Sequence, residues 1–278
     1  MVVEDVQEKN GRVGVTFDLW ETLIFDKPEL DEERGRMRCE GIRIALERIG
    51  ISLTLEDVMR GYEESAARFQ EVWDQNKEVS TLEQIVTIVE LAGRSLGKTR
   101  ISEEEAQALV NGYVEPTLTL PPGLDASVPG VLKELSALGT KIGLISNTGR
   151  APGETLRRLL EKYDVIRYFD ATVFSNEVGW RKPDARIFKQ AAKQLGVSPT
   201  EIIHVGDNPD ADFRGAKEAG MDAILFEPDP LEAPAWGPNS LYALNRRHAQ
   251  SLGKEIDHGS RIKSLNDVTR FVKRLIDA

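Results

Sequence analysis

The chain is poor in the residues that mark several protein classes. Cys39 is the only cysteine among 278 residues, so no intrachain disulfide is possible, and a lone thiol is typical of the reducing cytosol. No apolar run approaches the ~18 residues of a membrane helix, and the acidic, polar start of the chain does not resemble a signal peptide. Acidic residues outnumber basic ones by 46 to 36, a net charge of −10, which argues against nucleic-acid binding. We expect a cytoplasmic protein that contacts neither nucleic acid nor membrane.

The remaining composition, with 40% hydrophobic and 29% charged residues, is that of an ordinary globular protein. Short β-branched apolar runs bounded by polar residues predict buried strands at 13–17, 142–145, 172–174, 202–205 and 223–226. The last four alternate with helical patterns at about 130–138, 153–162, 184–195 and 210–219. This alternation predicts an α/β fold with a Rossmann-like parallel sheet covered by helices on both faces.

The stretch from about 27 to 120 has a different pattern, because it contains amphipathic helices and no comparable strand. Helices are predicted at 36–49, 54–73, 81–96 and 102–113. Ser102 and Glu105 form a capping-box pattern at the start of the last one. We therefore expect an all-helical domain over 27–120, inserted into a discontinuous core made of 1–26 and 121–278.

A second interruption lies at about 227–262. Four prolines fall between positions 228 and 238 and prevent regular structure there. A surface flap or partner contact is favoured over a ligand site lined by Trp236, Tyr242, Arg246 and Arg247. The final helix is expected to begin near Ser264.

Polar residues follow the predicted strands at the points where the strands end. Asp18 follows the first strand, Ser146 follows the second, and Asp207 and Asp212 follow the fourth. Ligands bind at this edge of open α/β sheets. Three carboxylates brought together there are costly unless a cation neutralises them, and oxygen ligands with open positions select Mg²⁺. With Lys182 as a cation and Ser146 as a hydroxyl, the set fits phosphoryl transfer.

These residues carry a resemblance to the haloacid dehalogenase-like (HAD) hydrolase superfamily. The motifs that match in order and spacing are Phe-Asp-Leu-Trp-Glu-Thr-Leu at 17–23, Ile-Ser-Asn-Thr at 145–148, Lys-Pro at 182–183, and Val-Gly-Asp at 205–207 with Asp212. The resemblance covers about 12–26 and 122–226, and it implies that the helical insertion is a cap over the core.

The resemblance also implies roles for single residues. Asp18 resembles the nucleophile that forms an aspartyl intermediate, Ser146 the hydroxyl that holds the transferring group, and Lys182 the cation that steadies both. Asp18, Asp207, Asp212 and the backbone carbonyl of Trp20 resemble the Mg²⁺ ligands. Asn147, Thr148 and Trp20 are expected to contact the substrate.

Position 20 departs from the phosphatase pattern, in which a second aspartate protonates the leaving oxygen. Trp20 cannot transfer protons, and the neighbouring Glu21 would point elsewhere. An aromatic residue here is also found in haloacid dehalogenases, which need neither a general acid nor a metal. Three functions stay open. The favoured one is a Mg²⁺-dependent phosphatase that acts on a small phosphorylated metabolite through an aspartyl-phosphate. The alternatives are a 2-haloacid dehalogenase that works through an aspartyl ester, and a catalytically impaired binding or regulatory paralogue.

Other residues have weaker cases. Arg34, Arg36 and Arg38 could reach an anionic substrate, but a solvated helix face is favoured. His204 lies in a predicted strand and is interpreted as a packed core histidine. The sequence does not reveal the oligomeric state.

Overall fold

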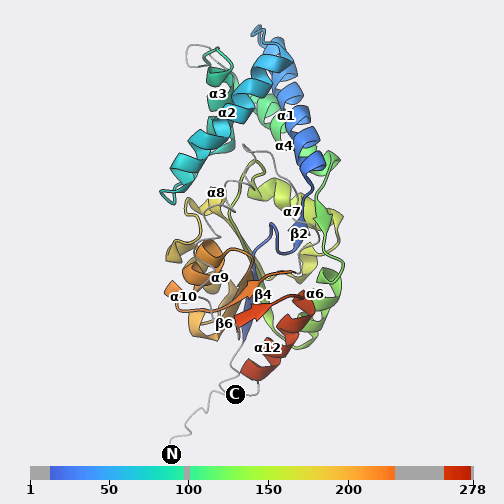
Figure 1. Ribbon diagram of the computed structural model, residues 1–278, viewed down its shortest axis with the longest axis vertical. Helices are drawn as coiled ribbons and strands as arrows, with labels where there is room; N and C mark the ends of the chain where they lie inside the picture. Colours follow the sequence, from blue (N-terminus) through green and yellow to red (C-terminus); the bar gives the residue numbers. More distant parts are fainter. Residues whose placement is uncertain (1–12, 97–100, 229–259, 277–278) are drawn as a thin grey trace, which may run out of the picture.

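A six-stranded, wholly parallel sheet forms the centre of the protein (Figure 1). The computed structural model describes residues 13–96, 101–228 and 260–276. The strand order is β5-β4-β1-β6-β7-β8. The bounds are β1 Gly14–Phe17, β4 Lys141–Ser146, β5 Ala171–Phe174, β6 Ile202–Gly206, β7 Asp222–Phe226 and β8 Arg261–Ile262. All five predicted strands are present, and the predicted α/β class is confirmed.

Helices cover both faces of this sheet, as their apolar stripes require. One face packs against α6, α7 and α12, and the other against α9 and α10. The bounds are α6 Val128–Ala137, α7 Gly153–Lys162, α8 Ser175–Val178, α9 Ala185–Leu195, α10 Gly215–Glu218 and α12 Val268–Ile276. The helix predicted at 210–219 is instead a π-helical turn, Pro209–Arg214, followed by α10. The final helix does begin near Ser264, whose hydroxyl accepts the amide of Asn266.

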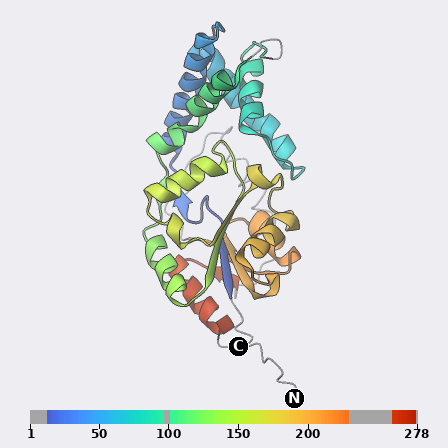
Figure 2. The same cartoon turned by 180° about the vertical axis from the view of Figure 1, so that it is seen from behind.

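Four helices gather at the far end of the molecule from the sheet (Figure 2); we call α1–α4 the helical block. Their bounds are α1 Pro28–Arg48, α2 Leu55–Trp73, α3 Thr81–Leu91 and α4 Glu103–Val114. They share a hydrophobic cluster of their own, built around Ile42, Leu46 and Ile88. A short helix, α5 Pro116–Thr119, and a two-stranded antiparallel ribbon, β2 Ile24–Phe25 with β3 Gly123–Leu124, lie where the chain passes between block and sheet. The division into domains at 27 and 120 stays a proposal.

Close helix contact explains two glycines of the block. A Cβ built at Gly41 of α1 would lie 2.2 Å from the carbonyl oxygen of Gly112 in α4. Glycine at both positions lets the two backbones approach, which no larger residue would allow. The predicted capping box is confirmed, because the Ser102 hydroxyl and the Glu105 carboxylate each accept the other residue's amide.

The first helix corrects two expectations. It begins at Pro28 rather than 36, because charged residues hide its apolar spacing. Arg34 and Arg38 are buried rather than solvated, and only Arg36 is exposed. Arg34 forms a 2.6 Å ion pair with the buried Asp26, while Arg38 donates to the Tyr113 carbonyl and to the Thr117 hydroxyl.

The predicted insertion at 227–262 lies mostly outside the described residues, as do Trp236, Tyr242, Arg246 and Arg247. Its end is described and is not irregular, because 261–262 form β8 against β7. Within the described parts of the chain, no helix has both the length and the apolar character needed to cross a membrane.

Candidate active site

The predicted polar residues meet at the carboxyl edge of three adjacent strands. Asp18 follows β1, and its amide donates to the Val205 carbonyl of β6 at 2.9 Å. Ser146 is the last residue of β4, and Asp207 directly follows β6. Because β4, β1 and β6 are neighbours in a parallel sheet, their ends come together there.

Lys182 reaches this edge from the loop between α8 and α9. Its Nζ lies 2.5 Å from Asp18 Oδ1, 2.5 Å from Asp212 Oδ1 and 2.9 Å from the Ile145 carbonyl oxygen. The three donors of an ammonium group are thereby satisfied. The lysine is 4% exposed, so it is a fixed positive charge beside the Asp18 carboxylate.

Asp18, Asp207 and Asp212 form an acidic triad, in which one carboxylate oxygen from each lies within 4.8 Å of the others. Burial, with a smaller contribution from Asp212, raises the pKa of Asp18 from 3.8 to about 7 despite Lys182. Burial and the neighbouring carboxylates raise the pKa of Asp207 well above its ordinary value. Three acids face one lysine, so all three can be ionised together only when a further positive charge balances them. An all-carboxylate donor set of this kind fits a hard divalent cation such as Mg²⁺.

The Asp212 carboxylate is oriented from three sides. Besides Lys182, His204 Nε2 lies 3.1 Å from Asp212 Oδ1, and the Asn208 amide donates to Oδ2 at 3.0 Å. Burial alone would raise the pKa of Asp212, but Lys182 and the bond from His204 hold it below its usual range. A Cβ at Gly206 would lie 2.3 Å from Asp212 Cγ, so the glycine leaves room for this carboxylate.

His204 is fully buried, as predicted, but it also has a polar role that its strand position does not signal. Since the carboxylate of Asp212 only accepts, His204 Nε2 donates to it, and Nδ1 accepts from the Thr16 hydroxyl at 2.9 Å. Burial lowers the pKa of His204, which keeps the ring neutral.

The two residues after Ser146 use their side chains within the protein. Asn147 Oδ1 accepts the Lys182 amide at 2.7 Å, and its Nδ2 donates to the Lys182 carbonyl at 3.0 Å. The Thr148 hydroxyl lies 3.0 Å from Ser175 Oγ, which also accepts the Thr148 backbone amide at 2.8 Å. Ser146 differs from both: among the residues that the structure describes, its Oγ makes one long bond, to the Asn147 carbonyl at 3.4 Å. The geometry thus makes Asn147 a support of Lys182, while the Ser146 hydroxyl keeps donor capacity for a ligand.

The turn after Asp18 places Trp20 and Glu21. Trp20 forms an isolated parallel bridge with Ile24 and packs, partly buried, against the main core cluster. Glu21 adopts a left-handed φ of 58°, and its amide donates to the Ile24 carbonyl. Asp210, the remaining acid of this region, pairs with Arg214 and lies outside the acidic triad.

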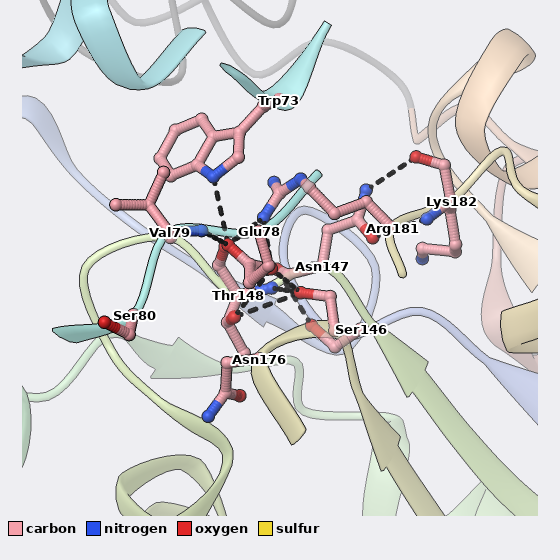
Figure 3. A network of polar contacts seen from close by, with 12 residues as sticks. Trp73, Glu78, Val79, Ser80, Ser146, Asn147, Thr148, Asn176, Arg181 and Lys182 are labelled. Carbon is pink, nitrogen blue, oxygen red and sulfur yellow. Dashed lines mark hydrogen bonds and ion pairs between the residues drawn. The ribbon is translucent and has the colours of Figure 1, made fainter. Parts of the chain in front are cut away.

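A polar network beside the site has no counterpart in the sequence motifs (Figure 3). Glu78, in the linker between α2 and α3, is inserted among Arg181, Ser175 and Thr148. A second contact runs from the sheet side to the block. Arg150, in the segment after β4, donates to the Ser65 and Tyr113 hydroxyls of the block. The sequence could have indicated Arg181, because it directly precedes the Lys-Pro motif at 182–183. Glu78 lies in a linker that contains no motif, so the sequence gives no indication of its role.

Comparison with known proteins identifies relatives for most of this region. The family model described as "Hydrolase: haloacid dehalogenase-like hydrolase" matches residues 14–220. Over 104 residues the chain is 36% identical to a glyceraldehyde 3-phosphate phosphatase of Methanothermobacter thermautotrophicus, covering 37% of this chain and 44% of that one. Over 127 residues it is 33% identical to the pyrimidine 5′-nucleotidase YjjG of Escherichia coli, covering 43% and 55%. The matched part is thus less than two thirds of either relative.

Solved structures agree with the fold. A 2-haloacid dehalogenase from Pseudomonas syringae superposes with a TM-score of 0.60 at 22% identity, covering 95% of this chain and 99% of that one. A HAD phosphatase from Thermococcus onnurineus superposes with a TM-score of 0.54 at 19% identity, covering 94% and 97%. At these identities the likeness concerns the fold, and it does not separate a phosphatase from a dehalogenase.

Proposed function

Because the chain belongs to the haloacid dehalogenase-like hydrolases, we propose that it is a Mg²⁺-dependent phosphatase that acts on a small phosphorylated metabolite. The acidic triad carries this proposal: three carboxylates beside a single lysine are stable together only when a cation balances them. The curated relatives named as phosphatases support it.

The proposed reaction proceeds in two displacements at phosphorus. An oxygen of Asp18 attacks, the bond from phosphorus to the leaving oxygen breaks, and an aspartyl-phosphate forms. Lys182 holds the attacking carboxylate in place, and the Ser146 hydroxyl donates to the transferring group. Water then attacks phosphorus, which releases inorganic phosphate and restores the Asp18 carboxylate.

Asp18, Asp207 and Asp212, with the Trp20 carbonyl, would hold Mg²⁺, and the bound ion supplies positive charge against the phosphoryl oxygens. The Asn147 amide keeps the Lys182 backbone in position. His204 and Asn208 hold the Asp212 carboxylate in its place within the triad. These supports are preformed, so little reorganisation accompanies the reaction.

Trp20 determines which phosphate esters the site should prefer. An indole cannot protonate a departing oxygen, so the leaving group departs as an anion. Aryl, enol and acyl phosphates should therefore react far better than alkyl phosphates. The test is the dependence of kcat/KM on leaving-group pKa in the presence of Mg²⁺. A flat dependence, with sugar phosphates as good as aryl phosphates, contradicts this mechanism.

The same tryptophan favours one second candidate, a 2-haloacid dehalogenase. In that reaction Asp18 displaces halide from carbon, and the resulting aspartyl ester is hydrolysed. Halide leaves already charged and requires no acid. A decisive experiment compares phosphate release and halide release with and without EDTA, using Asp18→Asn as the blank. The phosphatase proposal requires phosphate release that chelation abolishes, whereas halide release that survives EDTA would replace it. Turnover in neither assay would favour the binding paralogue.

A further inference from the structure

Glu78 joins the helical block to two loops, the one that directly follows Ser146 and the one that contains Lys182 (Figure 3). It lies in the linker between α2 and α3, yet its side chain is only 8% exposed, as is the Arg181 side chain that it pairs with. Oε2 and Oε1 lie 2.8 and 3.0 Å from Arg181 Nη1. Burying a charged side chain is costly unless specific partners bind it. The buried position of Glu78 therefore depends on its polar contacts as well as on packing.

Both oxygens of Glu78 are occupied by donors. Oε1 also accepts the Trp73 indole N–H and the Val79 amide, each at 3.0 Å. Oε2 accepts from the Ser175 hydroxyl and has a 3.4 Å contact with Thr148 Oγ1. Because these contacts within the protein occupy both oxygens, Glu78 does not replace the general acid that Trp20 lacks.

The contacts of Arg181 show what Glu78 holds in place. The guanidinium lies 4.4 Å from the Trp73 ring centroid, and Nη1 donates to the Thr148 carbonyl at 2.6 Å. One residue further on, the Lys182 backbone is bonded to both ends of the Asn147 amide. The loop at 147–148 and the loop at 181–182 are thus tied together, and Glu78 bonds to both.

We propose that Glu78 is a positioning residue, supplied by the helical block, that sets Ser146 and Lys182 relative to Asp18 by locking these two loops to each other. The inference rests on the proposed phosphatase function. It makes the catalytic geometry depend on the docking of the block, independently of any contact between Glu78 and substrate. Because the reacting groups must be placed to within about 1 Å, a small shift of either loop suffices to impair the reaction.

The test uses Glu78→Gln in the full chain, with p-nitrophenyl phosphate and Mg²⁺ as the probe. Glutamine keeps the size of the side chain but removes the charge that Arg181 requires. We expect kcat to fall about 100-fold, with KM changed less than about threefold because ground-state binding is untouched. Amide exchange should accelerate at Thr148 and Lys182 and stay unchanged at Leu144, which lies within β4. The matched control is Glu177→Gln, which breaks the pair with Arg157. Both of these residues lie on helices that flank the sheet, α7 and α8, so kcat and the exchange of the Thr148 and Lys182 amides should stay unchanged.

Two further variants show whether Glu78 acts through Arg181. The double variant Glu78→Gln with Arg181→Met should be no slower than Arg181→Met alone, because both substitutions cut the same link. Trp73→Phe removes only one donor to Glu78 and keeps an aromatic ring beside Arg181. It should lower kcat less than Glu78→Gln does. This milder variant still tests the inference if Glu78→Gln fails to fold.

The possible outcomes separate the inference from the proposed function. Unchanged kcat in Glu78→Gln, a rise in KM alone, or a loss of kcat with unchanged exchange at Thr148 and Lys182 would each overturn the positioning role. A wild-type protein that hydrolyses no phosphate ester would refute the phosphatase proposal. Faster exchange at the two amides in Glu78→Gln would still support the link between block and loops.

Discussion

The sheet edge and the helical block both bury charged side chains, but they balance them differently. At the sheet edge, Asp18, Asp207 and Asp212 face the single ammonium of Lys182, and the pKa values of two of the acids are raised. In the block region, Arg34 is matched by Asp26, and Arg150 is satisfied by hydroxyls, a carbonyl and the Tyr62 ring. A buried charge that is paired or fully hydrogen-bonded supports a structure, whereas several buried acids that share one counter-charge indicate a site that binds an ion or a substrate.

The largest effect is expected at the sheet edge. Asp18→Asn removes the proposed nucleophile without changing the size of the side chain, so kcat should fall about 10⁴-fold or more while the fold is kept. Steady-state phosphate release and circular dichroism check both parts. Asp210→Asn is the control, because Asp210 pairs with Arg214 and lies outside the triad. Comparable losses in both variants would mean that the site is not centred on Asp18.

In the block, breaking a matched charge should cost stability instead of chemistry. Arg34→Met leaves Asp26 buried without its guanidinium, which should lower the free energy of unfolding by about 3–5 kcal/mol. Urea denaturation measures the change. The exposed Arg36→Met serves for comparison, since its pair with Glu33 lies on the surface and should contribute little to stability. An equal loss of unfolding free energy in the two variants would show that the buried pair is no more important to stability than the surface pair.

Helix contact in the block is tested by Gly41→Ala. The added methyl would lie 2.2 Å from the Gly112 carbonyl oxygen, so α1 and α4 must move apart at a cost of about 1–3 kcal/mol. The same substitution at Gly130 of α6 has no atom within 4 Å of the added Cβ and should stabilise the protein slightly through helix propensity. Thermal melts of the two variants should therefore shift in opposite directions.

A smaller effect is expected at the start of α4. Ser102→Ala removes one half of the capping box and should lower stability by about 1 kcal/mol. Ser136→Ala, at an exposed position inside α6, should be neutral or mildly stabilising because alanine is the better helix former. A melt of Ser102→Ala that matches wild type would show that the cap contributes nothing.

The smallest effect is expected when the folded protein is treated with a thiol reagent, which Cys39 should resist. Burial raises the pKa of this thiol from 9.0 to about 12, so the reactive thiolate is scarce in the folded protein at pH 8. We expect no reaction with a disulfide reagent in buffer and complete reaction in urea. Because the folded-state pKa is raised, reactivity should appear only as the pH approaches 12. Rapid labelling of the folded protein at pH 8 would place the thiol in an accessible environment.

The sequence by itself determined the core strands and the main catalytic candidates. Each strand is a local apolar run, and Asp18, Ser146, Lys182 and Asp207 occur within short motifs at fixed distances from those runs. Local spacing records such features because a parallel sheet always brings strand ends to one edge. The capping box at Ser102 is equally local, and it too was predicted.

Only the tertiary structure decided which charges are buried and what they touch. Arg34 and Arg38 have the composition of a solvated face, yet Asp26, Tyr113 and Thr117 enclose them. Glu78 meets Arg181 across 103 positions of sequence, and His204 meets Thr16 across 188. Composition and periodicity report on neighbours within a few residues, whereas burial and pairing of charge depend on segments that only folding brings into contact.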